Sequence, residues 1–555
     1  MSRSRWSSPS KPPLALAALA ALPLVALGLF VVLPVAGMVG RGFAPDGHLD
    51  VVGVLEVLGR PRVHRVLWFT VWSAGLATVG TVLAGLPVAF VLYRLRFRGR
   101  GLLRAFVLMP FVMPTVVVGV AFRTLLVPSG PLGALRLDGT PAAIIAAMVF
   151  FNLAVVVRTV GSLWAGLDRR REEAAAALGA SPLQVLRTVT LPALAPGIVS
   201  AASVVFLFCA TSFGVVLTLG GLRYATVETE IYLLTTQLLD LRAAAALSLL
   251  QIVVVAVLLY VAQRTRARRE QPLDRVAERD ATRRPRRRDA GVVAVTGLVL
   301  VLVAAPLLTL VLRSLRVGGT WGLGHYRDLF TTGEGGALLV PVTTALTNSW
   351  RVAVDATLMA MLLGVLVAVV VSRRPQARAE RRALSVLDSL FMLPLGVSAV
   401  TIGFGFLVTL DRPPLDLRSS PVLVPIAQAM VALPLVVRTL VPVLRSVEPR
   451  QRQAAASLGA SPLRVALTVD LPVVRRPLLA ANDFAFAVSL GEFGATSFLS
   501  RPDRPTLPVV IYQLVSRPGE TNFGMALAAS VLLGLVTVAV MAAVERLRLV
   551  SAGAF

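Results

Sequence analysis

Long apolar segments alternate with short polar segments along almost the whole chain, and this pattern predicts membrane-spanning helices. Each apolar segment is long enough for an α-helix, which rises about 1.5 Å per residue, to cross a hydrocarbon core of about 30 Å. We expect twelve spans, at residues 14–39, 66–93, 103–127, 142–165, 194–219, 243–263, 291–313, 349–372, 384–410, 421–444, 477–500 and 523–544. The predicted fold class is therefore all-α, a polytopic integral membrane protein.

The composition supports this class and excludes several others. Hydrophobic residues make up 56% of the 555 residues, and the mean hydropathy is +0.79. The strict alternation of a membrane β-barrel is absent from the sequence. The single cysteine, Cys209, and the single lysine, Lys11, exclude a disulfide framework, a cysteine-rich metal site and a conventional phosphate-binding loop. We expect no catalytic residues, no cofactor and no metal.

The net charge of +26 comes from arginines that lie mainly between the apolar segments. That placement is typical of membrane topology rather than of a nucleic-acid partner, which we do not expect. Arginine is densest after the second span (94–104), between the sixth and seventh spans (264–288) and after the eighth span (373–382). With twelve spans, all three loops and both termini fall on one side of the bilayer. The positive-inside rule predicts that this side is cytoplasmic.

A 23-residue stretch occurs twice, 280 residues apart. Residues 172–194 read EEAAAALGASPLQVLRTVTLPAL, residues 452–474 read RQAAASLGASPLRVALTVDLPVV, and 14 of the 23 positions are identical. VVVRTV at 155–160 and LVVRTL at 435–440 continue the same repeat. The repeat predicts two homologous halves of six spans in parallel orientation. The predicted boundaries are 1–263 for the first half (core about 66–263), 264–289 for a basic cytoplasmic linker and 290–555 for the second half (core about 345–545).

Both copies of the repeated stretch predict a helix, a turn and a second short helix. An alanine-rich helix ends at a glycine, which accepts the left-handed conformation at little cost. A serine then suits the N-cap of the next helix, and a proline suits its first position. The residues predicted to form this site are Glu173, Ala174, Gly179, Ser181, Pro182, Gln453, Ala454, Gly459, Ser461 and Pro462. The alternative is a helix lying on the lipid surface, although tryptophan and phenylalanine, which favour such insertion, are absent from both copies.

The E-A-A…G construction between apolar spans resembles the signature of membrane permease subunits of ABC importers with the type I fold, and the resemblance covers nearly the whole chain. The stretches most similar to the fused two-half permeases for thiamine and for ferric iron are SFGVVLTLGG (212–221), TVETEIYLLTT (226–236), LSLLQ (247–251), SLGEFGATSFL (489–499) and RPTLPVVIYQ (504–513). The family's acidic residue is present as Glu173, whereas Gln453 stands at the equivalent position. Equal contributions from the two loops therefore do not follow from the resemblance.

The resemblance implies a function and a set of partners. The chain would translocate a small solute, thiamine or ferric iron, inward across the bacterial cytoplasmic (inner) membrane. Two copies of a separate ABC ATPase subunit would bind the two loops and hydrolyse ATP, so the chain itself would not be an enzyme. An extracytoplasmic substrate-binding protein would deliver the solute.

Three acidic residues lie in or beside the apolar segments. A charge there is costly and usually faces a cavity or a partner group, so Glu492, Asp483 and Asp355 are candidates to line the pathway. The alternative is a polar contact between helices. Pro110, Pro114 and Pro394 interrupt the third and ninth apolar segments. They predict bends, either static or involved in gating.

Two other functions fit a chain with twelve spans. A secondary transporter with parallel halves would also have a large central cytoplasmic loop, but the loop RLRFRGRG at 94–101 has none of the acidic residues typical of that class. A membrane scaffold or sensor would need an additional soluble domain, and no loop is long enough to supply one. Co-purification of an ATPase would separate these functions.

Overall fold

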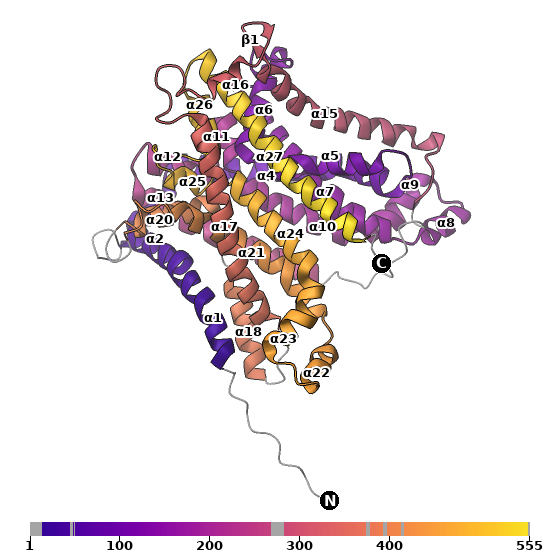
Figure 1. Cartoon of the computed structure of the whole chain (residues 1–555). Helices are drawn as coiled ribbons and strands as arrows, with labels where there is room; N and C mark the ends of the chain where they lie inside the picture. Colours follow the sequence, from indigo (N-terminus) through magenta and orange to yellow (C-terminus); the bar gives the residue numbers. More distant parts are fainter. Residues whose placement is uncertain are drawn as a thin grey trace, which may run out of the picture. The chain divides into compact units, whose positions relative to one another are not determined.

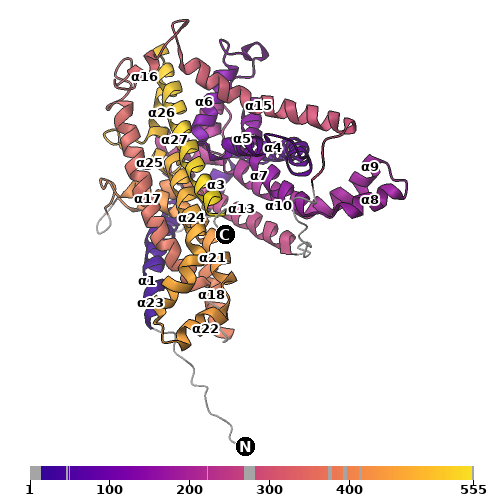
Figure 2. The ribbon, with the colours of Figure 1, turned by 45° about the vertical axis from the view of Figure 1, so that its right-hand side comes forward.

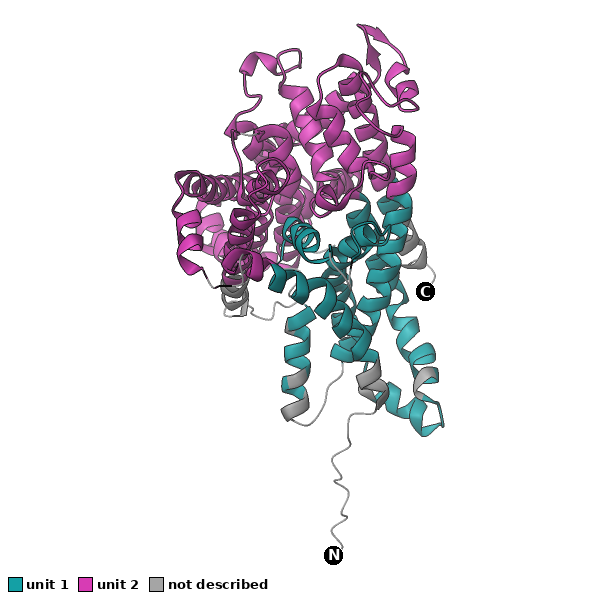
Figure 3. Cartoon of the chain, turned by 90° about the vertical axis from the view of Figure 1, so that its left-hand side faces the viewer, with its two compact units in different colours: residues 1–37, 350–490, 539–555 teal, residues 38–349, 491–538 magenta. Residues whose placement is uncertain are grey.

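The computed structural model describes residues 14–44, 48, 50–221, 223–267, 282–372, 378–391, 397–411 and 416–552. The chain divides into two compact units, each containing segments from distant parts of the sequence (Figure 3). Unit 1 comprises residues 1–37, 350–490 and 539–555, and unit 2 comprises residues 38–349 and 491–538. This division differs from the sequence repeat, because residues 491–538 pack with the first half of the chain. The boundaries of the two homologous halves stay a prediction from the sequence.

Unit 2 is a bundle of helices with one short hairpin (Figures 1 and 2). Its elements are α3 (Val51–Gly59), α4 (Pro61–Arg94), α5 (Arg100–Val112), α6 (Thr115–Leu126), η2 (Gly133–Leu135), α7 (Pro141–Gly166), α8 (Arg169–Ala177), α9 (Pro182–Val185), η3 (Leu186–Thr190), α10 (Leu191–Ala210), α11 (Gly214–Gly220), α12 (Val227–Thr236), α13 (Leu241–Ala267), η4 (Arg287–Asp289), α15 (Ala290–Ser314), β1 (Arg316–Val317), β2 (Thr320–Trp321), α16 (Gly324–Asp328), α25 (Thr496–Leu499) and α26 (Leu507–Ser516).

All the regular secondary structure in the described part of unit 1 is helical. Its elements are α1 (Leu14–Leu27), η1 (Gly28–Val32), α18 (Arg378–Phe391), α20 (Ala399–Thr409), α21 (Leu423–Ser446), α22 (Pro449–Ser457), α23 (Pro462–Val465), η5 (Ala466–Asp470) and α24 (Leu471–Gly491). The helices α2 (Leu33–Phe43), α17 (Val342–Val371) and α27 (Glu520–Ala552) contribute to both units, and α24 reaches unit 2 with its last residue.

The helices have the lengths and the apolar surfaces that a membrane requires. Within the described residues, nine helices are long and apolar enough to cross a bilayer, and a bent pair raises the number to ten. Two shorter apolar helices, α20 and α26, add to these. On α4, Leu76, Val79 and Leu83 recur at helical spacing and are each more than half exposed. Such an exposed apolar stripe is stable against lipid rather than water.

The third predicted span is a broken helix rather than a continuous one. Helices α5 and α6 meet at a bend of 103°. Pro114 stands at the break, and Met113 before it is extended, with ψ at 142°. A proline pushes the preceding residue out of the helical region and donates no N–H, so α5 ends there. Pro110 lies inside α5. Pro394, the third proline predicted to bend a span, lies outside the described residues.

Two other spans also depart from the prediction. The segment predicted as a fifth span, 194–219, contains the end of α10 at Ala210 and a new helix from Gly214. The segment predicted as an eleventh span, 477–500, contains the end of α24 at Gly491 and the short helix α25. Both breaks fall at equivalent positions of the repeat.

Two helix pairs at equivalent positions of the sequence repeat, one in each unit, pack in the same way. In unit 2, α4 packs on α7, and a Cβ at Gly85 would come within 2.6 Å of Val156. In unit 1, a Cβ at Gly364 on α17 would come within 2.5 Å of Val436 on α21. Val156 and Val436 lie 280 residues apart. The missing side chain lets the two helix backbones approach closely, as small residues do in membrane bundles.

Candidate functional site

The repeated stretch forms the same backbone structure in both copies. We define the first loop as residues 168–190, containing α8, α9 and η3, and the second loop as residues 448–470, containing α22, α23 and η5. In both views α8 and α9 lie beyond the end of α10, at one end of unit 2 (Figures 1 and 2). Helices α22 and α23 lie at one end of unit 1, beside α18 (Figure 1). Each loop is thus placed at the extremity of its own unit.

A glycine ends the first helix of each loop, as the sequence predicted. Gly179 has φ of 88° and Gly459 has φ of 83°, a region that favours glycine. The Ala180 N–H donates to the Ala175 carbonyl at 3.1 Å, and the Gly179 N–H donates to the Ala176 carbonyl at 3.0 Å. The equivalent bonds of Ala460 and Gly459 have the same lengths, 3.1 and 3.0 Å. This pair of bonds is the Schellman motif, which satisfies the last carbonyls of a helix.

The serine after each glycine is the N-cap of the second helix. The Gln184 N–H donates to Oγ of Ser181 at 3.4 Å, and the Ser181 N–H donates to Oε1 of Gln184 at 2.7 Å. These two bonds make a capping box. In the second loop the Arg464 N–H donates to Oγ of Ser461 at 3.4 Å. Both predicted N-caps are therefore present, with the reciprocal bond from a side chain only in the first loop.

The predicted site residues are exposed on both loops. Glu173, Ala174, Gly179, Ser181, Pro182, Gln453, Ala454, Gly459 and Ser461 are all exposed, and the side chain of Pro462 lies outside the described residues. The side chain of Glu173 is 61% exposed and accepts from Nη2 of Arg169 at 2.8 Å, one helical turn earlier. At the tip, Leu178 is 90% exposed and Leu458 is 89% exposed. The sequence analysis missed these two leucines, although both precede the predicted glycine in the repeat.

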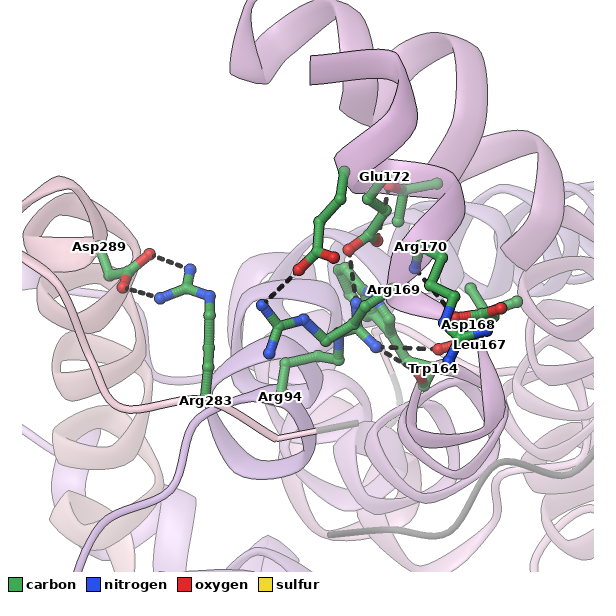
Figure 4. A network of polar contacts seen from close by, with 11 residues as sticks. Arg94, Trp164, Leu167, Asp168, Arg169, Arg170, Glu172, Arg283 and Asp289 are labelled. Carbon is green, nitrogen blue, oxygen red and sulfur yellow. Dashed lines mark hydrogen bonds and ion pairs between the residues drawn. The ribbon is translucent and has the colours of Figure 1, made fainter. Parts of the chain in front are cut away.

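A buried arginine anchors the first loop to the end of α4 (Figure 4). The Arg94 side chain, 4% exposed, donates from Nη2 to Oε2 of Glu172 at 2.5 Å. Its Nη1 donates to the carbonyls of Trp164 at 3.4 Å and Leu167 at 3.1 Å. Oγ1 of Thr190 donates to Oε1 of Glu172 at 3.0 Å. One carboxylate therefore ties α8 both to α4 and to the end of η3.

The second loop has an anchor of different chemistry at the equivalent positions. Arg452 and Asp470 replace Glu172 and Thr190 of the first loop. Nε of Arg452 donates to Oδ1 of Asp470 at 2.8 Å. Nη2 of Arg452 donates to the carbonyl of Leu444 at 3.3 Å, and Leu444 is equivalent to Trp164. A guanidinium therefore meets the same carbonyl in both loops, but it comes from α4 in one loop and from the loop itself in the other.

The described end of the basic linker is attached beside the first loop (Figure 4). The Arg96 N–H donates to the Arg283 carbonyl at 2.8 Å, and the Arg283 N–H donates to the Arg94 carbonyl at 3.0 Å. The Arg283 guanidinium donates to both oxygens of Asp289 at 2.6 Å. This hydrogen-bonded pair raises the pKa of Arg283 above its ordinary value, against the opposing effect of burial. Residues 268–281 of the predicted linker lie outside the described residues.

The three candidate pathway acids lie in different surroundings. Glu492 is buried, and its carboxylate accepts from the backbone N–H groups of Ala495 at 2.8 Å and Thr496 at 3.0 Å. It also accepts from the Thr496 hydroxyl. Asp483 is half-buried on α24, where the Asn482 amide donates to it at 3.4 Å, and Asp355 is exposed on α17. A role in the pathway stays a prediction for each of the three residues.

No group of three or more His, Cys, Asp or Glu residues among the described residues could hold a metal ion. Cys209 is buried and accepts from the Asn152 amide at 3.4 Å.

Comparison with known proteins places the chain in a family. Residues 77–269 match the family described as binding-protein-dependent transport system inner membrane component. The molybdenum transport system permease protein ModB of Mycobacterium bovis is 36% identical over 259 residues, which cover 93% of that protein and 44% of this chain. The chain belongs to this family of transport-system inner membrane components. It is a multi-pass inner-membrane permease subunit of a binding-protein-dependent ABC importer, as the sequence motifs predicted.

Two relatives in this permease family match much more of the chain. The thiamine transport system permease protein ThiP of Brucella suis biovar 1 is 27% identical over 559 residues, covering 98% of this chain and 97% of the relative. ThiP of Escherichia coli K12 is 29% identical over 464 residues, covering 81% and 83%. The resemblance to fused two-half permeases is thus confirmed over nearly the full length.

Proposed function

We propose that this permease carries thiamine inward and that each of its two loops binds one copy of an ABC ATPase subunit. The observation that carries the docking role is the pair Leu178 and Leu458, 90% and 89% exposed at the same position of two loops with the same backbone. A leucine held this far out of its own fold gains stability when a partner covers it. Burying a leucine side chain contributes about 1.5 to 3 kcal/mol.

The surroundings of each leucine favour a protein groove over a lipid surface. The helix before it presents small residues such as Ala174 and Ala454, which permit close backbone approach. A helix that inserts into lipid instead presents a broad face of large apolar side chains. In the first loop Leu183, 55% exposed, adds a second apolar contact at the second position of the next helix. Two short helices joined by a rigid turn therefore form one compact binding surface.

The proposed substrate rests on the relatives that cover both halves. Those relatives are named for thiamine, whereas ModB spans the length of about one half. Thiamine is a cationic heteroaromatic solute, which suits the aromatic residues discussed below. An extracytoplasmic binding protein would present it on the side opposite the loops, and the loops and both termini would face the cytoplasm. ATP would be hydrolysed by the separate ATPase subunits, because this chain lacks the phosphate-binding lysine motif.

Reconstitution tests the proposal directly. The chain, an ABC ATPase encoded with it and a thiamine-binding protein would be placed in proteoliposomes, and uptake of labelled thiamine would be measured. We expect uptake that needs ATP and the binding protein and that is lost in the double variant Leu178→Asp/Leu458→Asp. The matched control is Leu135→Asp, because Leu135 is also an exposed leucine, 57%, but belongs to neither loop. Full uptake with the double variant would overturn the docking role.

Labelling from the two sides of the membrane tests the orientation. A single cysteine would replace Gln184 in the first loop or Trp321 in the hairpin, in a Cys209→Ala background. Both native residues are exposed. We expect an impermeant maleimide to reach the cysteine at 321 in intact cells and the cysteine at 184 only in inverted vesicles. Labelling of both from one side would contradict the proposed topology.

A further inference from the structure

Four aromatic side chains, from two segments far apart in the sequence, form one cluster within unit 2. We define the aromatic quartet as Phe213, Tyr232, Phe493 and Tyr512. The rings of Phe213 and Phe493 are stacked, with centroids 5.2 Å apart and planes at 26°. The Phe213–Tyr232 centroids are 5.4 Å apart, the Phe493–Tyr512 centroids 5.6 Å, and the Tyr232–Tyr512 centroids 6.5 Å. Each ring of the quartet therefore contacts two others of the four, and Tyr232 also contacts the Phe498 ring at 5.4 Å.

The quartet is built from equivalent positions of the repeat. Phe213 and Phe493 are 280 residues apart in the sequence, and so are Tyr232 and Tyr512. The supporting helices are equivalent as well. The Val227 N–H at the start of α12 donates to Oγ1 of Thr70 at 3.1 Å, and the Leu507 N–H at the start of α26 donates to Oγ of Ser349 at 2.6 Å. The stacked pair is thus the place where two matching surfaces of the repeat meet.

Both phenylalanines lie where a helix is interrupted. Phe213 falls between α10 and α11, and Phe493 falls between α24 and α25. Non-helical backbone within a membrane is tolerated where it is buried in protein or lines a cavity. Phe213 is 6% exposed and Phe493 is 2% exposed, so the two rings now cover each other. The tyrosines beside them are partly exposed. The cluster is closed at its phenylalanine pair and accessible at its tyrosine pair.

We propose that the aromatic quartet is a gate on the translocation pathway and that its ring faces select a cationic heteroaromatic solute. This selectivity rests on the proposed thiamine transport. Separation of the Phe213–Phe493 pair exposes two parallel ring faces between which a flat heteroaromatic ring can stack. The same faces attract a cation through their negative electrostatic potential. Closure of the stacked pair behind the solute would then seal the pathway with the same residues that recognise it.

A reversible cross-link tests the gate without depending on the substrate. Cysteines would replace Phe213 and Phe493 in a Cys209→Ala background, and a short thiol-specific cross-linker would be applied to the complex with its ATPase. We expect high cross-linking without nucleotide and at least a fivefold lower yield with ATP and vanadate, which holds the ATPase closed. The matched control is a pair of cysteines replacing Phe122 and Phe150. Those rings are also in unit 2, 5.3 Å apart and buried, and should cross-link equally in both states.

The outcomes of this experiment separate a gate from a static core. Equal yields at 213 and 493 in the two states, as in the control pair, would show that the stacked pair does not open and would overturn the gate. Absence of cross-linking in both states would overturn the arrangement on which the proposal rests. Where the double-cysteine variant retains measurable thiamine uptake, cross-linking should stop that uptake and a reducing agent should return it to the level before cross-linking.

Selectivity is tested by uptake kinetics of labelled thiamine. Phe493→Leu and Tyr512→Leu should each raise the apparent KM for transport about tenfold, since loss of one cation–π contact changes affinity by roughly twofold to thirtyfold. Phe493→Tyr retains a ring face and should stay near the wild-type KM. Phe150→Leu is the control for loss of a buried ring. Unchanged KM in both leucine variants would overturn the selecting role. Absence of thiamine uptake by the wild-type chain would overturn both the selecting role and the assignment of thiamine as the substrate. The gate would still be tested in that case by the dependence of cross-linking on nucleotide.

Discussion

The first and second loops share one backbone and differ in what anchors it. In the first loop Glu172 accepts from Arg94 of α4 and from Thr190. In the second loop Arg452 occupies the position of Glu172 and donates to Asp470. An arginine thus stands in place of the glutamate and an aspartate in place of the threonine, while the helix end at the glycine keeps the same pair of hydrogen bonds.

This difference separates the part of each loop that can vary from the part that the proposed docking role requires. An anchor only has to hold the first helix against η3 or η5, and an ion pair or a hydrogen bond of either polarity can do that. The turn has to place an exposed leucine at a fixed point, and only a glycine does this without strain. The predictions below attack first what the loops share and then what distinguishes them.

The largest effect is expected at the shared turn. Valine at Gly179 or at Gly459 should reduce ATP-driven transport at least tenfold, because positive φ costs a non-glycine residue about 1 to 2 kcal/mol and a β-branched residue more. No side chain lies within 4 Å of a Cβ built at either glycine, so crowding is not the cause. Asparagine at the same positions is the control, since it tolerates positive φ. Normal transport and normal ATPase stimulation in both valine variants would show that coupling to the ATPase does not require the glycine turn.

The anchor of the first loop should rank second. Arg94→Gln leaves Glu172 and two carbonyls without their guanidinium partner. A buried group that loses a charged hydrogen-bond partner costs about 1 to 3 kcal/mol. Hydrogen exchange of the amides at 174–178 should therefore quicken by at least fivefold, with the equivalent amides of the second loop unchanged. Arg96→Gln is the matched control on the same segment. Equal protection of the first loop in both variants would contradict the anchoring role of Arg94.

The anchor of the second loop should depend on charge pairing rather than on the identity of each residue. The side chains of Arg452 and Asp470 are 30% and 22% exposed. Arg452→Asp or Asp470→Arg alone should open the second loop, and the double exchange should recover most of its protection. A coupling of about 0.5 to 1 kcal/mol is expected from such a double-mutant cycle. A coupling near zero would mean that packing alone holds the two helices together.

The smallest effect is expected at the exposed acid that only the first loop carries. Glu173→Gln should weaken ATPase binding severalfold, whereas Gln453→Glu should change it less in either direction. Glu173 is 61% exposed and paired with Arg169, and an exposed charge pair of this kind contributes at most about 1 kcal/mol. The loss should diminish at high salt. Wild-type affinity of Glu173→Gln at both low and high salt would leave docking to the apolar contacts alone.

Most of the fold could be predicted because its determinants are local. The apolar segments, the glycine at each helix end and the Ser-Pro start of the next helix are short-range signals, and the described structure contains helices at each predicted span. The breaks at Met113 and before Phe213 were harder, since an apolar run reads the same whether the backbone bends or continues. Pro114 signalled the first break, but the angle of 103° depends on packing with distant segments.

The anchors could not be predicted for a different reason. Arg94 is one of several arginines after the second span, and nothing local distinguishes it from Arg96 or Arg98. The second anchor did leave a signal, because Glu172 and Thr190 change together to Arg452 and Asp470 between the two copies. A paired change of two residues that are 18 positions apart indicates that they are in contact. In the structure, Nε of Arg452 and Oδ1 of Asp470 are 2.8 Å apart. The quartet had a similar signal in its two aromatic pairs.

The stoichiometry of the complex tests the central proposal most directly, namely that the two loops are two equivalent binding sites. Native mass spectrometry of the purified chain with its ATPase, without nucleotide, would count the bound copies. We predict two copies on the wild-type chain, one on Leu178→Asp or on Leu458→Asp, and none on the double variant. Two copies retained on the double variant, or a single copy on the wild-type chain that only one of the two substitutions removes, would contradict it.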